Sequence, residues 1–219
     1  MATTTYLDLV NDVLVRLRES TVATVNQNSY SALVSKLIND AKREVEDAWN
    51  WEFLRTTNTI TTSASTYTYS LTGAGAKFKI LRAYNDTEDW FMEYRPEAYM
   101  IQNILLTTSP QEGQPLYYTM KGIDANGDGI VDIWPIPDGV YSLKFDLVVP
   151  EAELVSDTDT TKLNRSAIVQ LAWAKTIEER GEDGGVGVSS QYAVAKQALG
   201  DAISIEANRR PDEINWAWS

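Results

Sequence analysis

The chain has 219 residues, of which 43% are hydrophobic and 23% charged, so it is long and apolar enough for one or two domains with a real core. Its 19 basic and 31 acidic residues give a net charge of −12, which argues against tight non-specific binding to DNA. The absence of cysteine and histidine excludes disulfides, thiol nucleophiles, Ser-His-Asp catalysis and zinc sites built on these residues. No apolar run reaches the roughly 20 residues that span a bilayer, and the first residues lack a signal-peptide core. We therefore expect a protein made in the cytoplasm, with no membrane partner.

The first predicted helix covers residues 3–19. Its apolar residues recur at the spacing of one helix face, and Thr4 or Thr5 can cap its start, with Asp8 in the first turn. The residues of this face are Tyr6, Leu9, Val10, Val13, Leu14 and Leu17.

The second predicted helix begins at Ser29 and has the most regular apolar stripe in the chain, with its charged residues, Lys42 and Glu46 among them, mostly off the stripe. At residues 49–54 the pattern changes from helical to alternating. There Trp49, Trp51 and Phe53 could stack on bases or sugars, but an aromatic cluster where a helix meets a sheet is more often core, and we expect core here.

Residues 53–150 read as a β-rich module. Strands are predicted within 53–71, with a turn at 63–65, and at 77–84 and 90–94; a short helix follows Pro96. Residues 116–120, 130–134 and 140–149 read as three antiparallel strands joined by Asx- and Gly-rich turns. The segment that follows, to residue 162, is predicted to be a polar loop with four acidic residues, Glu151, Glu153, Asp157 and Asp159.

Two more helices are predicted at 164–182 and 188–208, and Pro211 ends the second. The sequence thus predicts an α+β fold: a four-helix bundle formed from both ends of the chain, with an inserted antiparallel β module. The expected parts are residues 1–52 and 151–210 for the two halves of the bundle, 53–150 for the β module and 211–219 for an extended aromatic tail.

One turn resembles the start of a calcium loop. Asp124, Asn126, Asp128 and Asp132 occupy positions 1, 3, 5 and 9, with Gly129 at position 6, but position 12 is Pro135 rather than glutamate. The same composition suits a tight β-hairpin, so a plain turn is the favoured interpretation and calcium the alternative. No other cofactor is expected, and no spacing singles out a catalytic pair among the acids, so we expect no enzyme.

The tail carries the residues that we expect to bind a partner. Trp216 and Trp218 suit anchoring in a pocket of another subunit, and folding back onto the chain's own bundle is the alternative. The expected partner-binding residues are Arg209, Arg210, Ile214, Trp216 and Trp218.

The chain resembles the head-to-tail adaptor proteins of tailed phages, in particular the tail tubular protein A type of short-tailed phages. The resemblance lies in YLDLVNDVLVRL at residues 6–17, in INDAKREVEDAWNWEFL at 38–54, in the WPIPDG turn at 134–139 with the strand after it, and in the alanine-rich C-terminal third. It spans nearly the whole chain, as a pattern rather than as one invariant motif.

The resemblance implies a structural virion protein of the tail or neck, made in a bacterial host. Such adaptors form a ring, expected to be a dodecamer, between the portal protein and the tail tube or nozzle, around the channel through which the genome DNA passes without specific binding. By this resemblance residues 188–219 would contact the portal, with Trp216 and Trp218 as anchors, and the β module would contact neighbouring adaptors or the nozzle. The competing hypothesis is a glycan- or fibre-binding structural module of a virion.

Overall fold

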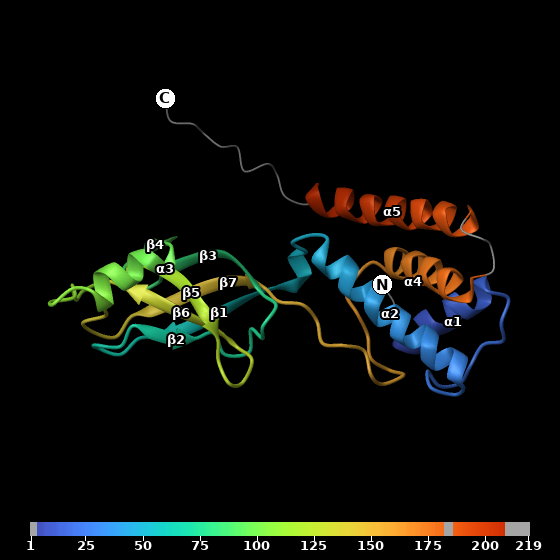
Figure 1. The fold of residues 1–219 in the computed structure, drawn as a ribbon, viewed down its shortest axis with the longest axis horizontal. Coiled ribbons are helices and arrows are strands. Elements are labelled where there is room, and N and C mark those ends of the chain that lie inside the picture. Colours follow the sequence, from blue (N-terminus) through green and yellow to red (C-terminus); the bar gives the residue numbers. More distant parts are fainter. Residues whose placement is uncertain (1–3, 182–185, 209–219) are drawn as a thin grey trace, which may run out of the picture. The chain divides into compact units, whose positions relative to one another are not determined.

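The computed structural model describes residues 4–181 and 186–208, and the chain divides into two compact units (Figure 1). The helical unit combines residues 1–53 with residues 151–219, and the β unit is Leu54–Pro150. The β unit is therefore a single continuous insertion in the sequence of the helical unit.

The helical unit contains α1 (Tyr6–Arg16), α2 (Ser29–Asp47), α4 (Arg165–Arg180) and α5 (Val186–Ala207). Thr5 and Asp8 form a reciprocal cap at the start of α1, and Asn28 and Ser31 form another at the start of α2, so the first free N–H groups of both helices are satisfied. Among the described residues, no helix combines the length and the apolar character needed to cross a membrane.

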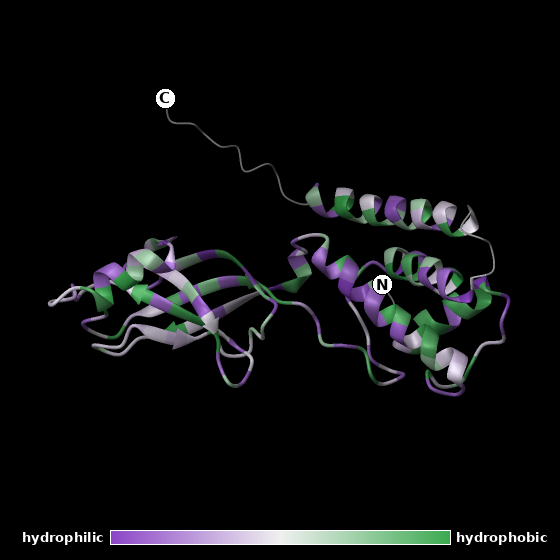
Figure 2. Ribbon diagram, in the orientation of Figure 1, coloured by the Kyte–Doolittle hydropathy of each residue, from purple (hydrophilic) through white to green (hydrophobic). Residues whose placement is uncertain are grey.

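The core of the helical unit comes from the predicted apolar stripes. Figure 2 shows hydrophobic residues alternating with hydrophilic ones along α2, and the hydrophobic ones are buried against α1 and α4. The buried residues include Leu9, Val10, Val13, Val34, Ile38, Ala41, Val45, Ala167, Ile168 and Ala172.

The β unit is built on one seven-stranded sheet with the order β1-β7-β3-β4-β5-β6-β2. Its strands are β1 (Arg55–Thr61), β2 (Thr68–Ser70), β3 (Lys79–Asn85), β4 (Trp90–Tyr94), β5 (Tyr117–Ile123), β6 (Gly129–Trp134) and β7 (Ser142–Val148). All neighbouring pairs are antiparallel except β4 and β5, which are parallel. The sheet is nearly closed, and Asn58 in edge strand β1 donates to the carbonyl of Thr72, just after edge strand β2, at 2.7 Å. Its interior is filled by a continuous cluster that includes Leu71, Val131, Ile133, Leu143, Phe145 and Leu147.

The expected four-helix bundle with an inserted antiparallel β module is wrong. The described residues form five α-helices and a large mixed sheet, and one of the helices, α3 (Glu97–Met100), lies in the β unit, where it continues into a π-helical turn, η2 (Ile101–Leu105). The chain from β4 to β5 runs through α3 and η2 and so returns in the same direction, which makes this pair parallel. The predicted run of three antiparallel strands is also wrong in part, because β7 pairs with β1 and β3 and not with β6.

Helix α5 is the reason that the helices do not form the expected bundle. Helices α1, α2 and α4 pack on one another, whereas α5 packs chiefly on α4. The buried residues of α5 are small or polar, namely Gln191, Ala195, Ala202 and Glu206, while Val194 and Ile205 are exposed. Its other large apolar residues, such as Leu199 and Ile203, are only partly buried, so the described side chains of α5 add no fully buried large apolar group to the helical core.

Gly129 provides a test of the packing in the β unit. A Cβ at this position would lie 2.2 Å from the ring of Phe78, so Gly129→Ala should displace the ring and lower the free energy of unfolding by about 1–3 kcal/mol. Gly139→Ala is the matched control, since no atom lies within 4 Å of its added Cβ. Urea unfolding of both variants measures the difference in stability. Equal stability of the two variants would contradict the close contact between Gly129 and the ring of Phe78.

Candidate contact surfaces

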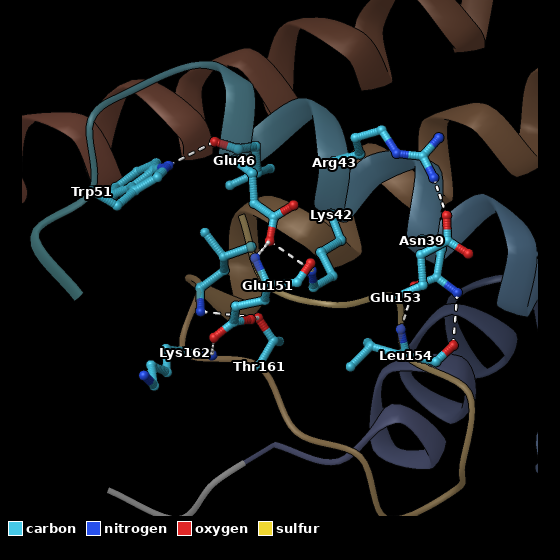
Figure 3. Close-up of polar contacts among 12 residues, drawn as sticks. Asn39, Lys42, Arg43, Glu46, Trp51, Glu151, Glu153, Leu154, Thr161 and Lys162 are labelled. Atoms are coloured by element: carbon cyan, nitrogen blue, oxygen red, sulfur yellow. Dashed lines mark hydrogen bonds and ion pairs between the residues drawn. The ribbon is translucent and has the colours of Figure 1, made fainter. Parts of the chain in front are cut away.

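The acidic loop expected at residues 151–162, called here the return segment, fixes the chain to the helical unit where it comes back from the β unit (Figure 3). The N–H of Glu151 donates to Glu46 in α2 at 3.1 Å, and its carbonyl accepts from Nζ of Lys42 at 3.2 Å. The side chain of Glu151 accepts from the hydroxyl of Thr161 and from the N–H of Lys162, at the far end of the segment. Glu151 therefore holds both ends of the return segment.

The pair formed by Lys42 and Glu46 lies in the interior of the helical unit. The ammonium and the carboxylate are 2.6 Å apart, and their side chains are only 3% and 4% exposed. Burial raises the pKa of Glu46, while the hydrogen bond from Lys42 opposes that shift. Sequence periodicity placed both residues off the apolar stripe of α2, yet they are buried because each has a partner in the other and in the backbone of Glu151.

The rest of the return segment binds α2 again and two further parts of the helical unit. Asn39 in α2 makes two hydrogen bonds to the backbone of Leu154, and Arg43 forms an ion pair with Glu153. Farther along, the carboxylate of Asp157 accepts from the N–H of Val25, and the carbonyl of Asp159 accepts from the N–H of Tyr6 at the start of α1. The segment thus connects α1, α2 and the connection between them.

Two of the three aromatic residues that follow α2 contribute to packing. Trp51 is 2% exposed, donates from Nε1 to the carbonyl of Val45 at 2.8 Å and stacks on Phe53 at 5.7 Å between ring centroids. The core interpretation is confirmed for Trp51 and is wrong for Trp49, which is exposed.

The calcium-like turn is closed by its own hydrogen bonds. The carboxylate of Asp124 accepts from the hydroxyl of Ser70 and from the N–H groups of Asp128 and Asn126, and these hydrogen bonds lower the pKa of this carboxyl. Asp128 accepts from the N–H of Gly75, and Asp132 binds Lys121 and Thr68. In residues 4–181 and 186–208 no three acidic side chains gather as metal ligands would, and calcium binding stays a hypothesis.

The β unit exposes large apolar side chains that sequence reasoning did not select. Three lie on β4, where Trp90, Phe91 and Tyr94 are 56%, 66% and 59% exposed. Others are Ile101, Leu105 and Leu106 in and after η2, Ile123 at the end of β5, and Val140. The available signal was the composition of WFMEY at residues 90–94, which puts three large aromatic residues into a strand of five. Exposed apolar groups at this density indicate protein–protein contact.

The helical unit offers a second surface on the outer side of α5, where Val194 and Ile205 are exposed. The residues expected to bind a partner at the end of the chain, Arg209, Arg210, Ile214, Trp216 and Trp218, lie outside the described residues. Their role remains a prediction.

Each unit exposes large apolar side chains, on β4 and η2 in the β unit and on α5 in the helical unit, and such side chains favour contact with other proteins. The family model for the SU10 adaptor protein matches residues 4–215, nearly the whole chain, and the chain belongs to this family. A comparison with curated proteins gave no match. The resemblance to phage head-to-tail adaptors is therefore confirmed, and the chain is a phage structural adaptor, a component of the virion and of a family that is generally non-enzymatic.

A double-mutant cycle tests the contribution of the buried ion pair between Lys42 and Glu46 to stability. Lys42→Met or Glu46→Met alone leaves one buried charge without its partner and should cost about 3–5 kcal/mol of unfolding free energy. The double variant removes both charges, so its loss should be smaller than the sum of the single losses by about 2–3 kcal/mol. Urea unfolding followed by circular dichroism measures all three variants.

The exposed pair of Arg43 and Glu153 is the matched control for this cycle, because it also joins α2 to the return segment. Its side chains are largely in water, so the coupling between Arg43→Met and Glu153→Met should stay below about 1 kcal/mol. Equal coupling energies in the two cycles would show that burial does not strengthen the interaction between Lys42 and Glu46.

Asp159 gives the return segment a dependence on pH. Its carboxylate accepts from the N–H groups of Val155 and Ser156, and these bonds hold its pKa below the ordinary value of 3.8. A carboxyl whose pKa is lower in the folded chain than in the unfolded chain stabilises the fold. This stabilisation is fully present at a pH above the pKa of the unfolded chain, and it is lost as the pH falls through the pKa of the folded chain. Asp159→Asn should therefore be less stable than the parent chain near neutral pH, and this difference should shrink as the pH falls below 3.8.

Urea unfolding at about pH 7 and about pH 3 measures that difference. Asp201→Asn, at an exposed position on α5, is the control. A difference for Asp159→Asn that stays constant or grows in acid would contradict this role.

Proposed function

We propose that this chain is a subunit of the ring that connects the portal protein to the tail tube or nozzle. The observation that carries the proposal is the family match over residues 4–215, which makes the chain an adaptor along nearly its whole length. The division into two units supports it, because an adaptor between two structures needs two contact surfaces. A dodecameric ring around the DNA channel is the assembly that we propose.

The portal contact is assigned to α5. This helix packs chiefly on α4 and exposes the large apolar side chains of Val194 and Ile205. Docking of α5 on a second protein would remove these side chains from water.

The β unit is assigned to neighbouring adaptors or to the nozzle. Its support is the exposed apolar surface on β4, on η2 and in the region of residues 121–139 and Val140. An apolar surface of this kind is stable in an assembly, where a partner covers it.

The charge of the chain agrees with a channel that conducts DNA without holding it. A net charge of −12 repels phosphate groups, and proteins that grip a duplex need a basic face. The genome is accordingly proposed to pass through the ring without specific binding.

The double substitution Val194→Asp and Ile205→Asp should weaken binding to the portal protein of the same phage. Placing charges on an apolar contact surface should reduce affinity at least about tenfold. Val155→Asp, at an exposed apolar position of the return segment, is the control. Co-sedimentation with purified portal rings measures the effect, and unchanged binding of the double variant would remove α5 from the interface.

The competing function, a glycan- or fibre-binding module, would rely on the exposed aromatic residues of β4. A glycan array probed with the intact chain should stay blank. Binding to one class of glycan that is lost in Trp90→Ala would favour this function over the adaptor ring.

A further inference from the structure

The sheet of the β unit has a gap where β4 ends before its two neighbours. Strand β4 pairs with β3 only along Ala83–Asn85 and with β5 only at Tyr117 and Tyr118. The N–H of Arg95 still donates to the carbonyl of Tyr118 at 2.9 Å, but Pro96 has no N–H to donate and leads the chain into α3.

Two strand edges remain on either side of this gap. Residues 79–82 of β3 pair with β7 on their other side, and residues 119–123 of β5 pair with β6 on theirs. Among the described strands, none pairs with these residues on the side of the gap. Strand β4 pairs with β3 through residues 90–92 and with β5 through residues 93 and 94, so it passes from the edge of β3 to the edge of β5 and leaves both edges open beyond it.

An open groove of about 720 Å³ occupies this gap. Its lining comes from both edges and includes Phe78, Ile80, Tyr94, Met120 and Ile123. Phe78, Ile80 and Met120 also pack against the core of the β unit, so the floor of the groove is apolar. Two open strand edges over an apolar floor are the arrangement that accepts an added strand.

The chain contains one segment with matching chemistry. In DEINWAWS, residues 212–219, Ile214, Trp216 and Trp218 alternate with Asn215 and Ala217, which is the period of a strand with one apolar face. Isoleucine and tryptophan favour strands, and the length of this run is close to that of the free edges in the groove.

Charge favours the same pairing. The segment begins with Asp212 and Glu213, and Lys77 and Lys79 are exposed where β3 begins, whereas Lys121 in the lining is already paired with Asp132. Acidic residues next to basic ones would set the position of the incoming strand.

We propose that residues 213–218 of a second copy of this chain add as a strand in the groove between β3 and β5. The backbone of the added strand pairs with both free edges, and Ile214, Trp216 and Trp218 lie on the apolar floor. The inference deepens the proposed function, because it names the contact that joins neighbouring copies in the ring, and it assigns the two tryptophans to a neighbouring adaptor instead of the portal.

The test uses the full chain with Trp216→Ala and Trp218→Ala and a synthetic peptide of residues 212–219. Backbone amide exchange by mass spectrometry should slow at least about tenfold in residues 79–82 and 119–123 when the peptide is added. A peptide with Asn215→Ala, altered on the opposite face, should protect these residues equally. Ile123→Arg, in the groove, should abolish the protection, whereas Val140→Arg, at an exposed apolar position outside the groove, should not.

A second arm identifies the source of the strand. In the parent chain without peptide, protection of the groove should increase with protein concentration, as expected for a strand supplied by another copy. Protection that is independent of concentration would show that each chain fills its own groove, and no protection by the peptide would overturn the site itself. Neither arm contains the portal, so a negative result leaves the proposed portal contact of α5 to be judged by its own experiment.

Discussion

The structure of the helical unit depends on the hydrogen bonds that bind Glu151 to the buried pair of Lys42 and Glu46. Two charges lie in the interior, each satisfied by the other and by the backbone of one residue. A buried ion pair adds little net stability compared with an apolar pair, but it is costly to break, so it favours one arrangement of its partners over others. Here that arrangement fixes the point at which the chain returns from the β unit. The other contacts of the return segment, from Asn39 to Asp159, extend the same polar connection to α1.

A fixed return point suits an inserted unit. In the β unit, β1 and β7 pair along their whole length, and the N–H of Val149 donates to the carbonyl of Leu54, so both ends of the insertion leave the sheet together. In the helical unit, Trp51 and Glu151 both bind residues of the second half of α2. Within each unit, the two chain segments that lead to the other unit are therefore held by hydrogen bonds of that unit. The β unit can be inserted in the sequence without disturbing the core of the helical unit.

Much of this architecture follows from local patterns. The apolar stripes of α1 and α2, the capping of α1 by Thr5, and the turn chemistry of the hairpins all depend on neighbouring residues, and these features are present in the structure. The parallel pairing of β4 with β5 was not accessible in the same way, because it depends on where the chain returns after α3. The packing of α5 was missed because a count of its apolar residues does not show that Val194 and Ile205 are exposed while Ala195 and Ala202 are buried.

Local sequence patterns also failed to reveal most of the candidate contact surfaces. A motif search selects Asp124 and its neighbours, whose carboxylates close a turn, and it overlooks the exposed Trp90 and Phe91. The four acidic residues of the return segment stand out in the sequence, but their hydrogen bonds to distant residues do not. Exposure and long-range hydrogen bonding are properties of the folded chain, and no spacing in the sequence encodes them directly. The family assignment does not share this weakness, because it uses the pattern of nearly the whole chain.

The central claim is that this adaptor forms a ring between the portal and the tail, and electron microscopy of the chain mixed with the portal of its own phage tests it most directly. The account predicts a symmetric ring added to the portal, with α5 at the portal surface and the β units in contact with one another. A bare portal beside free, unassembled chains would contradict it.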